Sequence, residues 1–178
     1  MENTNQTNTM SKDSLLKHVH GIEAWLEPFF SKFPHIPENG RKVIADIAPW
    51  IALIFGVLGL LGLLTAGSLM TLFAIPLLLT GGVWVIVGFI TTLLGLAAVI
   101  LQLLAFNPLK ARMKKGWNYL FYGLLLGVLS TIISVIGSTM STSMMYSNMH
   151  ATNSLISGAI SFLIGGWLLF EIRSQYKA

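Results

Sequence analysis

Residues Ile47–Leu109 read IAPWIALIFGVLGLLGLLTAGSLMTLFAIPLLLTGGVWVIVGFITTLLGLAAVILQLLAFNPL, and this stretch decides the fold. None of its 63 residues is Asp, Glu, Lys or Arg, and the charges that flank it are Asp46 and Lys110. A helix needs about 20 mostly apolar residues to cross the hydrocarbon core of a bilayer. Because no soluble fold of this size keeps such a run out of water, the stretch predicts helices embedded in a membrane.

The composition of the whole chain agrees with this interpretation. Of its 178 residues, 54% are hydrophobic and only 10% are charged, with a mean hydropathy of +0.72. Soluble domains carry about 25% charged residues. The chain has no cysteine, which excludes disulfides and thiolate metal sites. The first 45 residues hold no apolar core of the kind found in cleaved secretory signals, so we expect the first span to direct insertion.

The apolar segments predict an all-α integral membrane protein with four transmembrane helices, a short re-entrant or interfacial helix and an N-terminal amphipathic helix. The four-span domain is expected over residues 41–178, with spans at about 48–64, 83–106, 116–137 and 154–170. The short helix is Leu69–Leu79, which contains Pro76. Its 11 residues would be about 16 Å long as a helix, too short to span.

The first 40 residues differ from the rest. Residues 1–10 are rich in Asn and Thr and are predicted to be a disordered tail. Residues 11–40 are predicted to form an amphipathic helix and a linker that contains prolines, because Leu, Ile and Phe recur there at spacings of three and four. Pro28 is expected to end or kink this helix. The helix could lie in the membrane interface, which we favour, or dock on a protein partner.

The positions of Lys and Arg predict the topology. Five precede the first span, four lie between the second and third spans, two follow the fourth span, and the other two loops hold none. Four spans place all of these cations on one side, which the positive-inside rule assigns to the cytoplasm. We therefore expect a protein of the cytoplasmic membrane with both termini cytoplasmic. The cations closest to the spans are Arg41, Lys42, Lys110, Arg112, Lys114, Lys115 and Arg173.

Local spacing suggests further interactions near the spans. Lys42 and Asp46 are four residues apart and could pair on one helix. Small residues recur every fourth position in the third and fourth spans and predict a tight antiparallel hairpin, with a homodimer seam or a moving helix as alternatives. The members of this small-residue stripe are Gly123, Gly127 and Thr131 on the third span and Ser157, Ser161 and Gly165 on the fourth.

Catalytic motifs are missing from the sequence, and no charged residue lies inside the four predicted spans. A phosphate-binding glycine loop, a zincin motif and a nucleophile elbow are all absent. The hydroxyl groups of the spans, such as Thr91 and Thr131, are expected to serve hydrogen bonding of the helices more than a polar path. We expect neither an enzyme nor a cofactor.

One segment offers a metal-binding alternative. Residues 138–153 are polar and uncharged, and four of the chain's eight methionines lie within ten residues of one another there, followed by a histidine. Thioether sulfurs suit Cu(I), although methionine also adapts to irregular interfacial surfaces. The candidate ligands are Met140, Met144, Met145, Met149 and His150.

Three stretches carry a resemblance to known proteins. They are Ile47–Trp50 with the glycine-rich span after it, Leu109–Trp117 followed by Leu120–Tyr122, and Leu168–Arg173. Together they resemble small uncharacterised multi-span membrane proteins of bacteria with reduced genomes. The resemblance covers about Trp25 to Lys177 and implies a multi-span membrane fold. It carries no activity, so it assigns no functional residue.

These observations favour a non-enzymatic structural or interaction component of the cytoplasmic membrane. A small oligomeric channel or transporter is the first alternative, and a Cu(I)-binding outer loop is the second. The expected partners are the lipid bilayer and either further copies of the chain or another membrane protein. The basic loop between the second and third spans suits an anionic membrane surface better than nucleic acid, and no nucleic-acid partner is expected.

Overall fold

The computed structural model describes residues 21–65, 82–139 and 144–176. The chain divides into two compact units, residues 1–35 and 36–178. The predicted tail at 1–10, the first half of the amphipathic helix and the short helix predicted at 69–79 lie outside the described residues.

The described part of the first unit is a helix that ends at Phe30. Pro28 was expected to end or kink the helix, but the helix continues for two residues beyond it. Ser31 N–H donates to the Glu27 carbonyl at 2.9 Å, so the backbone hydrogen bonds continue past the missing proline N–H. The Phe29 ring lies 5.2 Å from Phe30 and 5.7 Å from Phe33, which forms a small aromatic cluster.

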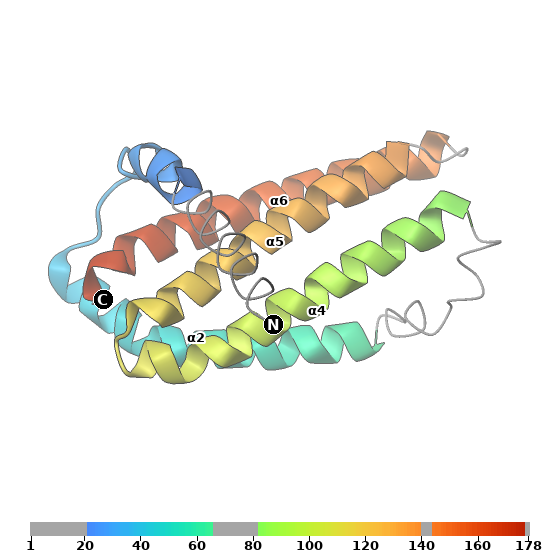
Figure 1. Ribbon diagram of the computed structural model, residues 1–178. Coiled ribbons are helices and arrows are strands. Elements are labelled where there is room, and N and C mark those ends of the chain that lie inside the picture. Colours follow the sequence, from blue (N-terminus) through green and yellow to red (C-terminus); the bar gives the residue numbers. More distant parts are fainter. Residues whose placement is uncertain (1–20, 66–81, 140–143, 177–178) are drawn as a thin grey trace, which may run out of the picture. The chain divides into compact units, whose positions relative to one another are not determined.

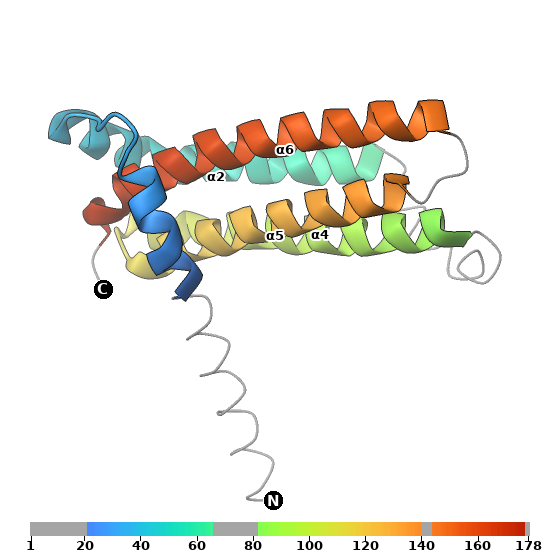
Figure 2. The ribbon, with the colours of Figure 1, turned by 90° about the horizontal axis from the view of Figure 1, so that it is seen from above.

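The second unit is made of four long helices that run along one axis (Figures 1 and 2). Consecutive helices run in opposite directions and pack on one another, whereas α6 contacts α2 much less than it contacts α5. The elements are α2 (Glu38–Thr65), α4 (Gly82–Lys110), α5 (Lys114–Thr139), α6 (Met144–Ile172) and the short 3₁₀ helix η2 (Arg173–Gln175).

All four helices are long and apolar enough to cross a membrane, which agrees with the prediction of an all-α protein with four such helices. The segments that meet these two criteria are Glu38–Leu64, Val85–Lys110, Lys114–Ser138 and Thr152–Gln175. The fourth helix begins earlier than predicted, at Met144. The segment 138–153, which we interpreted as a loop, is therefore helical over most of its length. Polar side chains such as Ser and Asn do not prevent a helix, because a helix satisfies its own backbone hydrogen bonds.

Glycines of α2 allow close contact with α4. A Cβ atom at Gly56 would lie 2.8 Å from Leu103, and one at Gly59 would lie 2.9 Å from Val99. The two positions are three residues apart and bring the α4 side chains directly onto the α2 backbone. Close packing of this kind holds helices together where apolar burial contributes little.

The predicted hairpin of α5 and α6 exists, and of the predicted stripe residues Thr131 and Gly165 lie in its contact. A Cβ atom at Gly158 would lie 2.6 Å from the Thr131 side chain, and one at Gly165 would lie 3.5 Å from Leu124. Gly123 instead approaches the Ala98 carbonyl of α4. Gly127 has nothing within 4 Å of its would-be Cβ atom.

The remaining members of the small-residue stripe, Ser157 and Ser161, are exposed. The Ser157 hydroxyl donates to the Ser154 carbonyl of its own helix at 3.3 Å. Within this chain, the expected contact through Gly127, Ser157 and Ser161 was therefore wrong. A four-residue spacing is longer than the 3.6 residues of one helical turn, so over several turns such a stripe drifts around the helix.

Candidate functional site: the polar cluster at one end of the bundle

The connector between α4 and α5 ends α4 with a Schellman motif. Arg112 N–H donates to the Leu109 carbonyl at 3.0 Å, and Met113 N–H donates to the Pro108 carbonyl at 2.9 Å. This motif requires a residue in the left-handed conformation, which is usually glycine. Here the residue is Arg112, with φ of 56°. An arginine costs about 1–2 kcal/mol in this conformation relative to the right-handed one, so its side chain must compensate.

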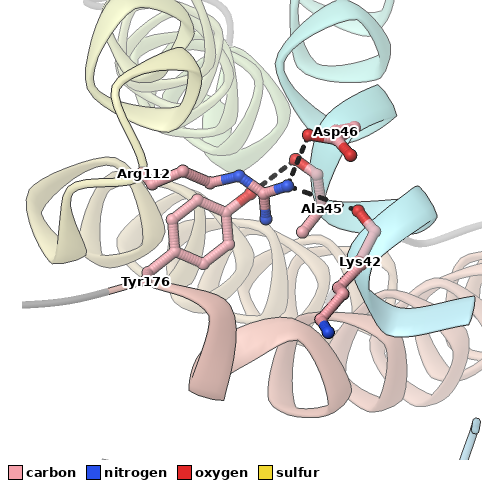
Figure 3. A network of polar contacts seen from close by, with 5 residues as sticks. All are labelled: Lys42, Ala45, Asp46, Arg112 and Tyr176. Carbon is pink, nitrogen blue, oxygen red and sulfur yellow. Dashed lines mark hydrogen bonds and ion pairs between the residues drawn. The ribbon is translucent and has the colours of Figure 1, made fainter. Parts of the chain in front are cut away.

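The Arg112 side chain reaches across to α2 (Figure 3). Its Nη2 atom donates to the Lys42 carbonyl at 3.3 Å and forms an ion pair with Asp46 Oδ1. The guanidinium carbon also lies 5.9 Å from the centre of the Tyr176 ring. One side chain thus joins the α4–α5 connector to α2 and to the C-terminal residues.

Replacing Arg112 tests this balance between backbone strain and side-chain contacts. We expect Arg112→Ala to lower the free energy of unfolding by about 1–2 kcal/mol, because it loses the contacts and keeps the left-handed backbone. Arg112→Gly loses the same contacts but relieves the strain, so it should be about 1 kcal/mol more stable than the alanine variant. Chemical unfolding in detergent micelles measures both. At the helical control position Lys115, glycine should be less stable than alanine; equal stability of the two Arg112 variants would contradict the argument.

Tyr176 fills a hydrogen-bonding position that a proline leaves open. In a helix, the Ala45 carbonyl would accept from the N–H of residue 49, but Pro49 has none. The Tyr176 hydroxyl donates to this carbonyl at 3.2 Å (Figure 3). Tyr176 is only 6% exposed, and Ala45 is fully buried. The proline in α2 and the tyrosine near the C-terminus, 127 positions apart by their numbers, therefore form one structural unit.

The burial of Tyr176 makes stability depend on pH. Burial raises its pKa from 10.0 to about 12, with the charge of Asp46 adding to this and the nearby Arg112 opposing it. Between these values the unfolded tyrosine has lost its proton and the folded one has not, so stability falls as the pH rises. The contribution is complete below pH 10 and is lost by about pH 12.

We therefore expect the native protein to lose more stability than Tyr176→Phe between pH 10 and 12. Unfolding in detergent at several pH values measures the difference, and using the difference removes the contribution of other groups that titrate in this range. At pH 7 the phenylalanine variant should be less stable by about 1–3 kcal/mol, because the Ala45 carbonyl is left buried without a donor. Parallel pH curves for the two proteins would refute the assignment.

A buried carboxylate connects the end of α6 to the start of α2. The Glu171 side chain is 4% exposed and forms an ion pair with Arg41, whose Nε atom lies 2.9 Å from Glu171 Oε2. The same oxygen accepts the Ile36 N–H at 3.2 Å. A negative charge at the N-terminal end of a helix interacts favourably with the helix dipole. The Arg41 Nε also donates to the Ile36 carbonyl at 2.8 Å.

Trp117 links α5 to the C-terminal part of α6. Its indole N–H donates to the Leu169 carbonyl at 2.7 Å, and the side chain is fully buried. The ring stacks on Phe121 at 5.2 Å and meets Phe170 edge-on at 5.8 Å. Leu169 is near the end of α6, where carbonyls lack helical partners, so the indole satisfies one of them.

Five residues form the Arg112 network with Asp46 and Tyr176 and the ion pair of Arg41 with Glu171, and we call them the end cluster. It joins α2, the α4–α5 connector and the C-terminal end of the second unit. Its members are Arg41, Asp46, Arg112, Glu171 and Tyr176.

The structure changes one predicted ion pair. Lys42 was expected to pair with Asp46, but its Nζ atom lies 2.9 Å from Glu38 Oε1, one turn earlier in α2. Asp46 pairs with Arg112 instead. Both acids are four residues from Lys42, so helix spacing alone could not choose between them.

The topology-setting cations of the second unit lie at one end of the bundle. Arg41 and Lys42 contact the C-terminal segment and the connector, and Arg173 lies 5.6 Å from the Trp117 ring. The connector supplies Lys110, Arg112, Lys114 and Lys115. Which side of the membrane this end faces stays a prediction.

The methionine-rich segment is only partly described. Met140 lies outside the described residues, whereas Met144, Met145, Met149 and His150 belong to the first two turns of α6. Four of the five candidate Cu(I) ligands therefore lie on a helix and not on a loop. Cu(I) binding by this segment stays a prediction. Among residues 21–65, 82–139 and 144–176, no group of three His, Asp or Glu could hold a metal ion.

The geometry defines a bundle of four apolar helices, compatible with a membrane protein, whose charged residues are gathered at one end. In the end cluster, Glu171 pairs with Arg41 and Asp46 pairs with Arg112, so both carboxylates join helix ends. Comparison with protein-family models, curated proteins and solved structures finds no match.

Proposed function

We propose that this protein is a non-enzymatic structural or interaction component of the cytoplasmic membrane, with both termini in the cytoplasm. The observation that carries the proposal is that the end of the bundle and its long sides differ in chemistry. Charged residues hold helix ends together at one end, while the long sides of the helices present apolar residues. Only 11–22% of the most apolar part of each span is buried within the chain, which leaves the sides for lipid or for a membrane partner.

The hydroxyl groups of the spans support this proposal over transport. Thr91 donates to the Val87 carbonyl at 2.9 Å, and Thr131 donates to the Gly127 carbonyl at 3.0 Å. Ser138 likewise donates to the Val135 carbonyl of its own helix at 2.8 Å. These hydroxyl protons are used within their own helices, so they are not available for donation to a solute. The sequence between Gly116 and Phe170 also holds no Asp, Glu, Lys or Arg.

The experiment that tests the proposal is a flux measurement with purified protein in liposomes. We expect the release of entrapped ions and small dyes to equal that of protein-free liposomes. Release above that level, together with an oligomeric mass in detergent, would favour the alternative of a small oligomeric channel. The topology is tested separately with a reporter fused after Met145, which should be extracytoplasmic.

A further inference from the structure

The four cations of the α4–α5 connector divide into two kinds. Arg112 forms an ion pair with Asp46, as described above. Lys110, Lys114 and Lys115, which we call the connector lysines, have no carboxylate partner among residues 21–65, 82–139 and 144–176. Lys110 and Lys115 are exposed, and Lys114 is half-exposed. The connector therefore carries three positive charges that the described part of the fold does not neutralise.

Aromatic rings lie beside two of these lysines. The Lys110 Nζ atom is 6.0 Å from the centre of the Trp50 ring, and Lys115 Nζ is 5.7 Å from the Tyr119 ring. Trp50 is 53% exposed and packs edge-on against Phe106 at 5.4 Å. A ring attracts an ammonium group by about 0.5–1 kcal/mol at exposed sites, but it does not cancel its charge.

This combination suits the boundary between lipid and water. Tryptophan and tyrosine are enriched at that boundary, and Lys110 is the last residue of a predicted span. An ammonium group at this height lies where lipid phosphates lie, and the rings below it lie where the glycerol and the first acyl carbons lie.

We infer that the connector lysines, together with Trp50 and Phe106 below Lys110, bind the headgroup of an anionic phospholipid. The ammonium groups contact the phosphodiester, and the rings pack on the upper part of the lipid. A zwitterionic lipid is bound less well, because its own cation competes for the phosphate. This inference rests on the proposed insertion into a membrane and is independent of the proposed structural role.

The test uses the full-length protein in a nonionic detergent, titrated with short-chain phosphatidylglycerol or phosphatidylcholine. We expect phosphatidylglycerol to raise the melting temperature and to remain bound in native mass spectra at concentrations where phosphatidylcholine does neither. The triple variant Lys110→Gln, Lys114→Gln and Lys115→Gln should bind phosphatidylglycerol at least about tenfold more weakly, since each lysine near a lipid surface contributes about 1 kcal/mol. Lys110→Gln alone should weaken binding in the same direction, which keeps the test valid if the triple variant does not fold.

Lys42→Gln is the matched control. It removes one positive charge from the same end of the bundle, but Lys42 is already paired with Glu38 at 2.9 Å. Its preference for phosphatidylglycerol should equal that of the native protein. Equal binding of the two lipids, or equal losses in Lys42→Gln and Lys110→Gln, would overturn the inference. An equal melting shift with inorganic phosphate, or displacement of the lipid by an RNA oligonucleotide, would also overturn it. Insertion into liposomes and flux are measured in separate experiments, so a negative result for lipid binding does not contradict the proposed function.

Discussion

Gly116→Ala should be among the most destabilising single substitutions in this protein. A Cβ atom at this position would lie 2.5 Å from the backbone nitrogen of Leu109 and 2.9 Å from the carbonyl carbon of Pro108. Backbone atoms of the last turn of α4 cannot move aside as a flexible side chain can. Overpacking typically costs about 1–3 kcal/mol, and a clash with backbone atoms belongs at the upper end; here it acts on the turn that places Arg112.

Gly127→Ala provides the matched control on the same helix. Nothing lies within 4 Å of a Cβ atom at Gly127, and alanine favours a helix over glycine by about 1 kcal/mol. We therefore expect Gly127→Ala to leave the melting temperature in detergent unchanged or to raise it, while Gly116→Ala lowers it by several degrees. If the two variants melted at the same temperature, the close approach of α4 and α5 at Gly116 would be refuted.

Trp117→Ala should lower the free energy of unfolding by about 3–5 kcal/mol. The substitution removes a fully buried ring that contacts Phe121 and Phe170, and it leaves the Leu169 carbonyl without its indole donor. Trp117→Phe should lose less, because it keeps most of the ring contacts and loses only the hydrogen bond and some volume.

Trp50→Ala is the control for loss of a tryptophan as such. The Trp50 ring is 53% exposed, so its removal should cost much less stability. Thermal and chemical unfolding of all four proteins in one detergent measure the series. A loss at Trp50 as large as that at Trp117 would show that the aromatic packing at the start of α5 does not dominate stability.

The spans could be predicted because their signal is local. A charge-free apolar run in a bilayer forms a helix, because its backbone groups must bond to one another. Whether the helix is long enough to cross follows from the number of apolar residues. The grouping of cations at one end of the bundle was likewise visible, since Arg41, the connector and Arg173 alternate with uncharged loops along the chain.

The end cluster could be predicted only in part. Asp46 was recognised as the charge that flanks the apolar stretch, but its pairing with Arg112 was not predicted. One signal for Tyr176 was present, because Pro49 inside a helix leaves the Ala45 carbonyl without an N–H. The glycines that matter most, Gly116 and Gly158, were missed, since each depends on which backbone or side chain of another helix lies opposite.

By itself, the sequence determined that the protein has four apolar helices, in which order they follow and where along the chain their charges lie. Tertiary structure alone decided which charges pair, which glycines touch a neighbouring helix and that the Tyr176 hydroxyl donates to the Ala45 carbonyl. The physical reason is that hydropathy adds up along the chain, whereas an ion pair or a close backbone contact depends on the rotation of two helices about their axes. Residues more than 60 positions apart, such as Asp46 and Arg112, can form an ion pair only when the helices are packed with the right rotation.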